Sequence, residues 1–114
     1  MPEIDPVWEV TVGDVKRMID APEPFTLIDV REPEEHQLCR IPGAKLIPLG
    51  DIPNRLNEIR ALADQGPLVL HCHHGKRSMN ATVFLRNNGI EDVKSMAGGI
   101  DEWSAQIDPS VPKY

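Results

Sequence analysis

The stretch that decides the fold runs from residue 67 to residue 78 and reads PLVLHCHHGKRS. Its first five residues are almost all apolar, which is typical of a strand buried on both faces of a parallel sheet. A short polar segment containing Gly75 follows. The spacing then predicts a helix over residues 78–88, with an inward face formed by Met79, Val83 and Phe84. The stretch therefore predicts a strand–loop–helix unit of an α/β protein.

The same alternation of strands and helices extends over the rest of the chain. Further strands are predicted at residues 8–10, 25–30, 44–48 and 93–96. Further helices are predicted at residues 12–19, 51–62 and 100–106, and the first of them has Thr11 as its N-cap. This pattern predicts one domain over residues 1–114, built on a parallel sheet with helices on both faces. Residues 1–6 and 107–114 are expected to be loose tails.

Length, charge and hydropathy exclude several classes of function. The 114 residues leave room for one domain. The net charge of -6 argues against a nucleic-acid partner, and no stretch is long and apolar enough for a membrane span. The first ten residues have neither a basic nor an apolar region of a secretory signal. A cytoplasmic protein is therefore predicted, in which Cys39 and Cys72 stay reduced.

Cys72 lies at the point where ligands bind in such sheets, beyond the carboxyl end of a strand. The N-terminus of the following helix offers unpaired N–H groups and a partial positive charge. A tight turn at Gly75 can direct further amides toward an anion, and Lys76 and Arg77 add positive charge. All three effects favour a thiolate over a thiol. Cys72 is therefore predicted to be an activated nucleophile.

The distribution of charge along the chain indicates an anionic ligand for this loop. Residues 65–90 contain no Asp or Glu but three basic residues, so the other 88 residues carry nine basic and eighteen acidic side chains. An acidic protein that keeps carboxylates out of one segment is expected to bind an anion there. The alternative is a structural cysteine in a polar loop of no special function.

A metal site is the second alternative, because residues 71–74 read HCHH and His36 and Cys39 could supply another pair of ligands. Adjacent residues that leave a strand point in opposite directions, so few of the four could face one ion. A cation would also lie beside Lys76 and Arg77. No metal and no cofactor are therefore predicted.

Four short motifs, at residues 27–36, 41–49, 72–78 and 98–103, read LIDVREPEEH, IPGAKLIPL, CHHGKRS and GGIDEW. In this order they resemble the segments IDVREPEEY, HIPGAxNIPL, Cys-Arg-Ser-Gly-x-Arg-Ser and GGxxxW of the rhodanese family. The resemblance covers nearly the whole chain. It departs from the family at His73 and His74, which replace Arg and Ser, at Cys39-Arg40, which replaces Gly-His, and at His36, which replaces an aromatic residue.

The resemblance implies a single rhodanese-like domain with a five-stranded, mostly parallel sheet, and a sulfurtransferase whose Cys72 alternates between thiolate and persulfide. Thiosulfate or another sulfane-sulfur donor would supply the sulfur, and a thiol or protein acceptor would remove it. Asp29 and Arg31 are expected to organise the loop. Substrate binding is expected from the loop residues His73, His74, Gly75, Lys76, Arg77 and Ser78.

Two further functions stay open at this point. Cysteine-dependent phosphatases and arsenate reductases use a similar loop, but their signature is Cys-x5-Arg, whereas Cys72 and Arg77 are separated by four residues. A non-catalytic binding module could also keep the fold, although the intact nucleophile argues against this. Cys39 could form an internal disulfide with Cys72, or could be a small packed residue.

Overall fold

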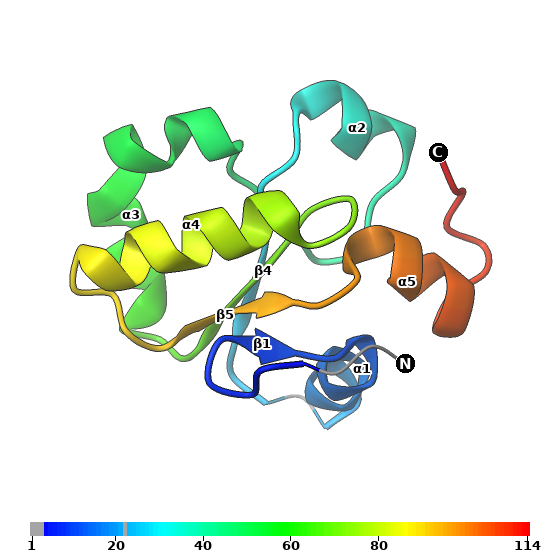
Figure 1. The fold of residues 1–114 in the computed structure, drawn as a ribbon, viewed down its shortest axis with the longest axis horizontal. Coiled ribbons are helices and arrows are strands. Elements are labelled where there is room, and N and C mark those ends of the chain that lie inside the picture. Colours follow the sequence, from blue (N-terminus) through cyan, green and yellow to red (C-terminus); the bar gives the residue numbers. More distant parts are fainter. Residues whose placement is uncertain (1–3, 22) are drawn as a thin grey trace.

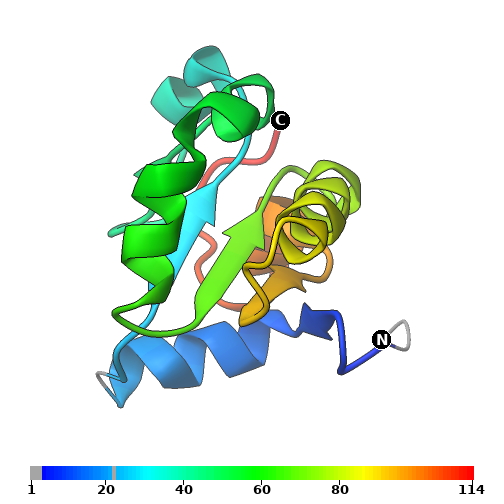
Figure 2. The same ribbon diagram turned by 90° about the vertical axis from the view of Figure 1, so that its left-hand side faces the viewer.

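The computed structural model describes residues 4–21 and 23–114. One sheet contains five strands in the order β1 (Glu9–Val10), β5 (Val93–Met96), β4 (Leu68–His71), β2 (Thr26–Asp29) and β3 (Lys45–Leu46) (Figure 1). The four strand pairings among the described residues are all parallel. Figure 2 shows β2 and β4 side by side and pointing the same way. The prediction of a single α/β domain with a five-stranded, mostly parallel sheet is confirmed.

The sheet separates two apolar cores, since successive residues of its strands point to opposite faces. Leu27 and Val69 belong to the core formed with α1 (Val12–Asp20) and α5 (Gly99–Gln106). Ile28 and Leu70 belong to the other core. The elements over that second core are the 3-10 helix η1 (Leu49–Arg55), α3 (Leu56–Ala63) and α4 (Lys76–Asn87). The short helix α2 (Pro33–Leu38) follows β2 and lies beyond one end of the sheet (Figure 1).

Helix α1 begins where its sequence predicts. The Thr11 hydroxyl accepts a hydrogen bond from the Asp14 N–H (3.0 Å), and the Asp14 carboxylate accepts one from the Thr11 N–H (2.9 Å). This reciprocal pair is a capping box, which satisfies two N–H groups that have no partner within the helix. The prediction of Thr11 as the N-cap is confirmed.

Two predicted helices differ from the structure. Helix α4 begins at Lys76, and its buried residues are Ser78, Ala81, Thr82 and Leu85. The predicted inward face is wrong for Val83, which is exposed, because the buried face carries two hydroxyl side chains that hydropathy does not select. The predicted helix 51–62 is a 3-10 helix as far as Arg55 and α-helical only from Leu56. The internal Pro53 lacks the N–H that an α-helical bond would need.

Residues 107–114 are packed on the domain, where the sequence predicted a loose tail. Val111 is buried, and its carbonyl accepts a hydrogen bond from Ser104 Oγ (2.6 Å). The segment runs from α5 back toward α2, where the Tyr114 hydroxyl donates to Glu35 (2.7 Å) (Figure 1). Of the predicted N-terminal tail, residues 1–3 lie outside the described residues. No helix among the described residues is long and apolar enough to cross a membrane.

Candidate active site

The loop that carries Cys72 connects β4 to α4 and lies between the ends of β2 and β5 (Figure 1). β2 and β4 end level with each other, because Asp29 pairs with His71. The Val30 N–H donates to the His71 carbonyl (3.0 Å), which continues this pairing beyond the strands. The segment after β2, including Arg31, therefore lies beside the Cys72 loop.

Two backbone amides converge on the sulfur of Cys72. The Gly75 N–H donates to Sγ at 3.1 Å and the Ser78 N–H at 3.4 Å. Gly75 has φ +112°, a backbone conformation that favours glycine, and this turn directs its amide toward the sulfur. Ser78 lies in the first turn of α4, where the N–H groups have no partner within the helix. Cys72 itself is 1% exposed, so its sulfur lies inside a closed loop.

The hydroxyl of Ser78 fixes the position of this loop. Its Oγ lies 3.5 Å from the Cys72 sulfur, donates to the Gly75 carbonyl (3.1 Å) and is 2.7 Å from Ser95 Oγ. Ser95 belongs to β5, so the hydroxyl pair ties the start of α4 to the sheet. Ser95 was not singled out from the sequence, because a buried serine in a strand carries no local signal of its partner.

Helix α5 holds the other side of the loop. The Ile100 N–H donates to the Cys72 carbonyl (2.9 Å), and the Asp101 N–H donates to the His73 carbonyl (3.1 Å). Gly99 makes this approach possible, because a Cβ on it would lie only 2.5 Å from the Cys72 carbonyl oxygen. The sequence identified Gly98 and Gly99 only as part of the motif at residues 98–103, although a glycine pair just before a short helix is a signal of close backbone approach.

A carboxylate from another part of the chain reaches the loop and changes its charge. Glu35, in α2, accepts hydrogen bonds from both terminal nitrogens of Arg77 (2.7 and 3.0 Å). Residues 65–90 contain no acidic residue, but the charge of Arg77 is still compensated, because Glu35 comes from 42 residues earlier in the chain. Lys76 is exposed beside it. The sequence predicted a positive field from Lys76 and Arg77 together. Because Glu35 neutralises Arg77, the field comes from Lys76 and from the N-terminus of α4.

The ion pair keeps Glu35 ionised. The hydrogen bonds from Arg77 lower the pKa of the Glu35 carboxyl from 4.5 to about 2, against a smaller effect of burial. In the unfolded chain the same group takes up its proton as the pH falls below about 4.5. The unfolded chain therefore binds more protons between these values, and the contribution of Glu35 to stability is lost as the pH falls from 4.5 toward 2.

Glu35→Gln is therefore expected to cost about 2 kcal/mol of unfolding free energy at pH 7 and much less at pH 3. The measurement is urea unfolding of the wild type and the variant at both pH values. Glu34→Gln, at an exposed position on the same helix, is the matched control. A Glu35→Gln deficit that stays the same at pH 3 would contradict the assignment.

Arg31 and Asp29 form a buried ion pair beside the loop. The guanidinium donates to both Asp29 oxygens (2.9 and 2.7 Å) and to the Cys39 carbonyl (2.7 Å), and both side chains are fully buried. His36 Nδ1 lies 2.8 Å from the second Asp29 oxygen. Despite burial, which acts to raise it, the pKa of Asp29 is lowered by these partners, chiefly Arg31. Among the described residues, no hydrogen bond joins either of these two side chains to the Cys72 sulfur, so a role in supporting the loop stays a prediction.

His71 precedes Cys72 and is fully buried at the end of β4. Burial lowers its pKa to about 4, against the opposing charge of Asp29, whose carboxylate lies 3.9 Å away. The imidazole is therefore neutral near pH 7. Its side chain is fully covered in this structure, as the Cys72 sulfur beside it almost is.

His73 and His74 form the rim of the loop. Their rings stack with centroids 3.9 Å apart, and the His73 ring also stacks on Tyr114 at 4.0 Å. The Tyr114 hydroxyl accepts from Arg31 (3.0 Å) and donates to Glu35 (2.7 Å), so the C-terminal residue links the rim to both ion pairs. Tyr114 was not predicted in the site, because it is 41 residues from His73 and follows a segment without helical or strand periodicity.

Cys39 and Cys72 are both free thiols and belong to different cores. Cys72 packs with the residues under α3 and α4, whereas Cys39 packs with those under α1 and α5. Mild oxidation is therefore expected to give no Cys39–Cys72 disulfide, which peptide mapping after digestion would check. Recovery of the linked peptide pair from monomeric protein would contradict this expectation.

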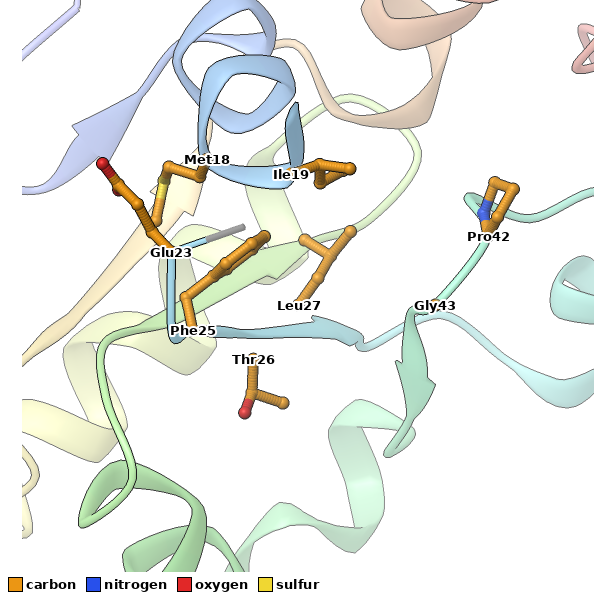
Figure 3. Close-up of a pocket in the computed structure, with 8 residues that line it drawn as sticks. All are labelled: Met18, Ile19, Glu23, Phe25, Thr26, Leu27, Pro42 and Gly43. Carbon is orange, nitrogen blue, oxygen red and sulfur yellow. The ribbon is translucent and has the colours of Figure 1, made fainter. Parts of the chain in front are cut away.

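A pocket of about 390 Å³ lies away from this loop, at the start of β2. Figure 3 shows Phe25 and Leu27 pointing toward Met18 and Ile19 of α1, with Thr26 pointing the other way. Glu23 supplies the carboxylate of its lining. None of its lining residues belongs to the Cys72 loop or touches it through the hydrogen bonds described above, so the pocket is no part of the candidate active site.

The comparisons with known proteins agree with this geometry. The family model of the rhodanese-like domain matches residues 11–106 of the sequence. The adenylyltransferase and sulfurtransferase MOCS3 of Arabidopsis thaliana is 28% identical over 118 residues, which cover 92% of this chain and 25% of that protein. Three curated relatives are matched over 52%, 39% and 25% of their own length, so this chain spans about half of such proteins or less.

Two solved structures are similar over nearly their whole length. A rhodanese-like domain protein from Staphylococcus aureus has a TM-score of 0.78 and 29% identity, covering 94% of this chain and 98% of that one. The human single-domain sulfurtransferase TSTD1 has a TM-score of 0.73 and 28% identity, covering 86% and 96%. The family model covers most of the chain, and the fold is shared. This chain belongs to the rhodanese-like domain family.

Proposed function

We propose that this chain is a sulfurtransferase in which Cys72 carries a sulfane sulfur as a persulfide. The observation that carries the proposal is the pair of amides, from Gly75 and Ser78, that donate to the Cys72 sulfur at the N-terminus of α4. Donors fixed in this way stabilise an anion without having to reorganise during the reaction. The same donors suit the thiolate, and they also suit the persulfide anion, whose charged outer sulfur is bonded to the Cys72 sulfur.

The proposed reaction has two steps. In the first, the Cys72 thiolate attacks the outer sulfur of thiosulfate. The sulfur–sulfur bond of the donor breaks, sulfite leaves with the electron pair, and a Cys72 persulfide anion remains. In the second, a nucleophilic acceptor attacks the outer sulfur of the persulfide and Cys72 leaves as the thiolate. Cyanide would give thiocyanate, and a low-molecular-weight or protein thiol would take the sulfur in the cell. Neither step needs a cofactor.

The surroundings of Cys72 suggest how the substrates bind. Lys76 and the loop amides would attract the dianionic donor. Arg77 would contribute less, because its charge is partly neutralised by Glu35. Because Cys72 is almost fully covered, the loop has to open before a donor can reach the sulfur. The free state of both thiols suits a reducing compartment, and we propose a cytoplasmic location on that basis.

The phosphatase alternative is less well supported. A cysteine-dependent phosphatase needs an acid that protonates the leaving alcohol, and Glu35 is the carboxyl group next to Arg77. With a pKa of about 2, Glu35 is ionised near neutral pH and is a poor proton donor. The loop also has four residues, one fewer than the phosphatase signature, between Cys72 and Arg77. Both observations favour sulfur transfer.

The experiment is thiocyanate formation from thiosulfate and cyanide by the wild type and by Cys72→Ser. The wild type is expected to turn over, and the variant is expected to lose about 10³-fold or more of that rate, because it lacks the nucleophile. Hydrolysis of aryl phosphates without thiocyanate formation would establish the phosphatase instead. Equal rates for wild type and Cys72→Ala would indicate a binding module without catalysis by this residue.

A further inference from the structure

Three side chains that can bind a metal ion meet at the rim of the Cys72 loop. His73 and His74 come from the loop, and Asp101 comes from the first turn of α5. One nitrogen or oxygen atom of each lies within 4.8 Å of the corresponding atoms of the other two. His74 Nε2 is 3.9 Å from Asp101 Oδ2. The two segments are tied together at this point, because the Asp101 N–H donates to the His73 carbonyl (3.1 Å).

The two histidines lie on the same side of the chain, which the sequence argument did not expect. Alternation of successive side chains holds for an extended strand, but residues 72–75 form a turn after β4. In this turn the His73 and His74 rings stack with an interplanar angle of 29°. The reason given for excluding a metal therefore fails for this pair of neighbours.

His73 is available as a ligand. Its Nε2 is covered and has no hydrogen-bond partner among residues 4–21 and 23–114. A buried ring nitrogen without a partner is uncommon, because it has lost water without gaining another bond.

We propose that His73, His74 and Asp101 form a binding site for a divalent transition-metal ion of the zinc class. Two imidazole nitrogens and one carboxylate oxygen suit Zn²⁺ or Co²⁺ better than Mg²⁺ or Ca²⁺, which prefer oxygen ligands. Three protein ligands leave a fourth position for water or an anion. This inference is independent of sulfur transfer, since none of the three ligands is the Cys72 sulfur.

The ligand atoms must move closer together when the ion binds. Ligands at about 2.0–2.2 Å from a tetrahedral zinc lie about 3.3 Å from one another. The side chains of His74 and Asp101 are 66% and 34% exposed, so both have room to rotate. Lys113 opposes binding, because its ammonium group lies 3.1 Å from the other Asp101 oxygen. A metal ion would have to share that carboxylate with Lys113 or displace it.

The test uses the full chain carrying Cys72→Ser, because zinc would otherwise bind the reactive thiol directly. Calorimetric titration with Zn²⁺ is expected to show one ion per chain. His74→Ala and Asp101→Asn should each weaken binding by about tenfold or more, as expected for loss of a ligand. Glu102→Gln, one residue further along the same helix, is the matched control and should bind as tightly as the parent. Lys113→Met should bind more tightly.

Cobalt distinguishes this site from a thiolate site. The Co²⁺ complex of the Cys72→Ser protein is expected to show no thiolate-to-cobalt charge-transfer band, and the His74→Ala variant should lose the cobalt spectrum at the same concentration. Absence of saturable Zn²⁺ binding by the Cys72→Ser protein would overturn the proposal. So would equal affinities for His74→Ala, Asp101→Asn and Glu102→Gln, or a charge-transfer band showing Cys39 as a ligand.

Discussion

Gly99→Ala is expected to lower the free energy of unfolding by about 3 kcal/mol and to impair sulfur transfer at the same time. Gly99 has φ +61°, where an alanine costs about 1–2 kcal/mol. Its new Cβ would also lie 2.4 Å from the His73 carbonyl oxygen and 2.5 Å from that of Cys72, and neither backbone atom can rotate away. The loop and α5 must separate, which strains the hydrogen bonds from Ile100 and Asp101.

Gly89→Ala is the matched control for this prediction. Gly89 also has a positive φ, +84°, but a Cβ there would have no other heavy atom within 4 Å. It should therefore show the backbone cost alone, about 1 kcal/mol, and no change in the rate of sulfur transfer. Urea unfolding and the thiosulfate assay measure both effects. Equal losses of stability in the two variants would mean that the close approach of α5 to the loop contributes nothing.

Arg31→Ala is expected to destabilise the domain by about 3–5 kcal/mol. The wild-type guanidinium neutralises Asp29, which is fully buried, and donates to the Cys39 carbonyl and to the Tyr114 hydroxyl. Removing it leaves a buried carboxylate whose remaining side-chain neighbours, among the described residues, include His36 at 2.8 Å and the buried His71 at 3.9 Å. The free-energy cost of leaving the Asp29 charge buried without its partner is much larger than the stability that the intact ion pair adds. The expected loss is therefore large.

The control for Arg31 is an ion pair on the surface. Lys16 and Asp20 form one at 2.9 Å, with about half of each side chain exposed. Lys16→Ala should change the unfolding free energy by no more than about 0.5 kcal/mol, because water and salt screen the interaction. Arg31→Lys should fall between the two, since it keeps the charge but not the two parallel hydrogen bonds to Asp29. A loss below 1 kcal/mol for Arg31→Ala would contradict the buried ion pair.

The elements with a strong local signal were predicted from the sequence. The apolar runs gave strands at residues 25–30 and 67–71, each within one or two residues of the structure, and Thr11 marked the start of α1. The buried face of α4 was harder to predict, because it includes Ser78 and Thr82. The Ser78 hydroxyl is hydrogen-bonded to that of Ser95, and the Thr82 hydroxyl donates to the Ser78 carbonyl within the helix. Hydropathy alone places such hydroxyl residues outside.

The candidate site was predicted as far as it is local in sequence. Cys72 and Gly75 lie together just before a helix, which was enough to suggest amides directed at a sulfur, and Ser78 was included through the resemblance to the rhodanese family. The partners from elsewhere could not be found this way, because Glu35 and Tyr114 reach the site only through the tertiary fold. The charge of the loop was mispredicted for this reason, because the sequence does not show that Glu35 pairs with Arg77.

The most direct test of sulfur transfer through Cys72 is the intact mass of the protein after incubation with thiosulfate. The wild type is expected to gain the mass of one sulfur atom and to lose it again when cyanide is added. Cys72→Ser, which keeps the Gly75 and Ser78 amides but not the thiolate, is expected to gain nothing. An unmodified wild type, or the same gain in Cys72→Ser, would contradict a persulfide on Cys72.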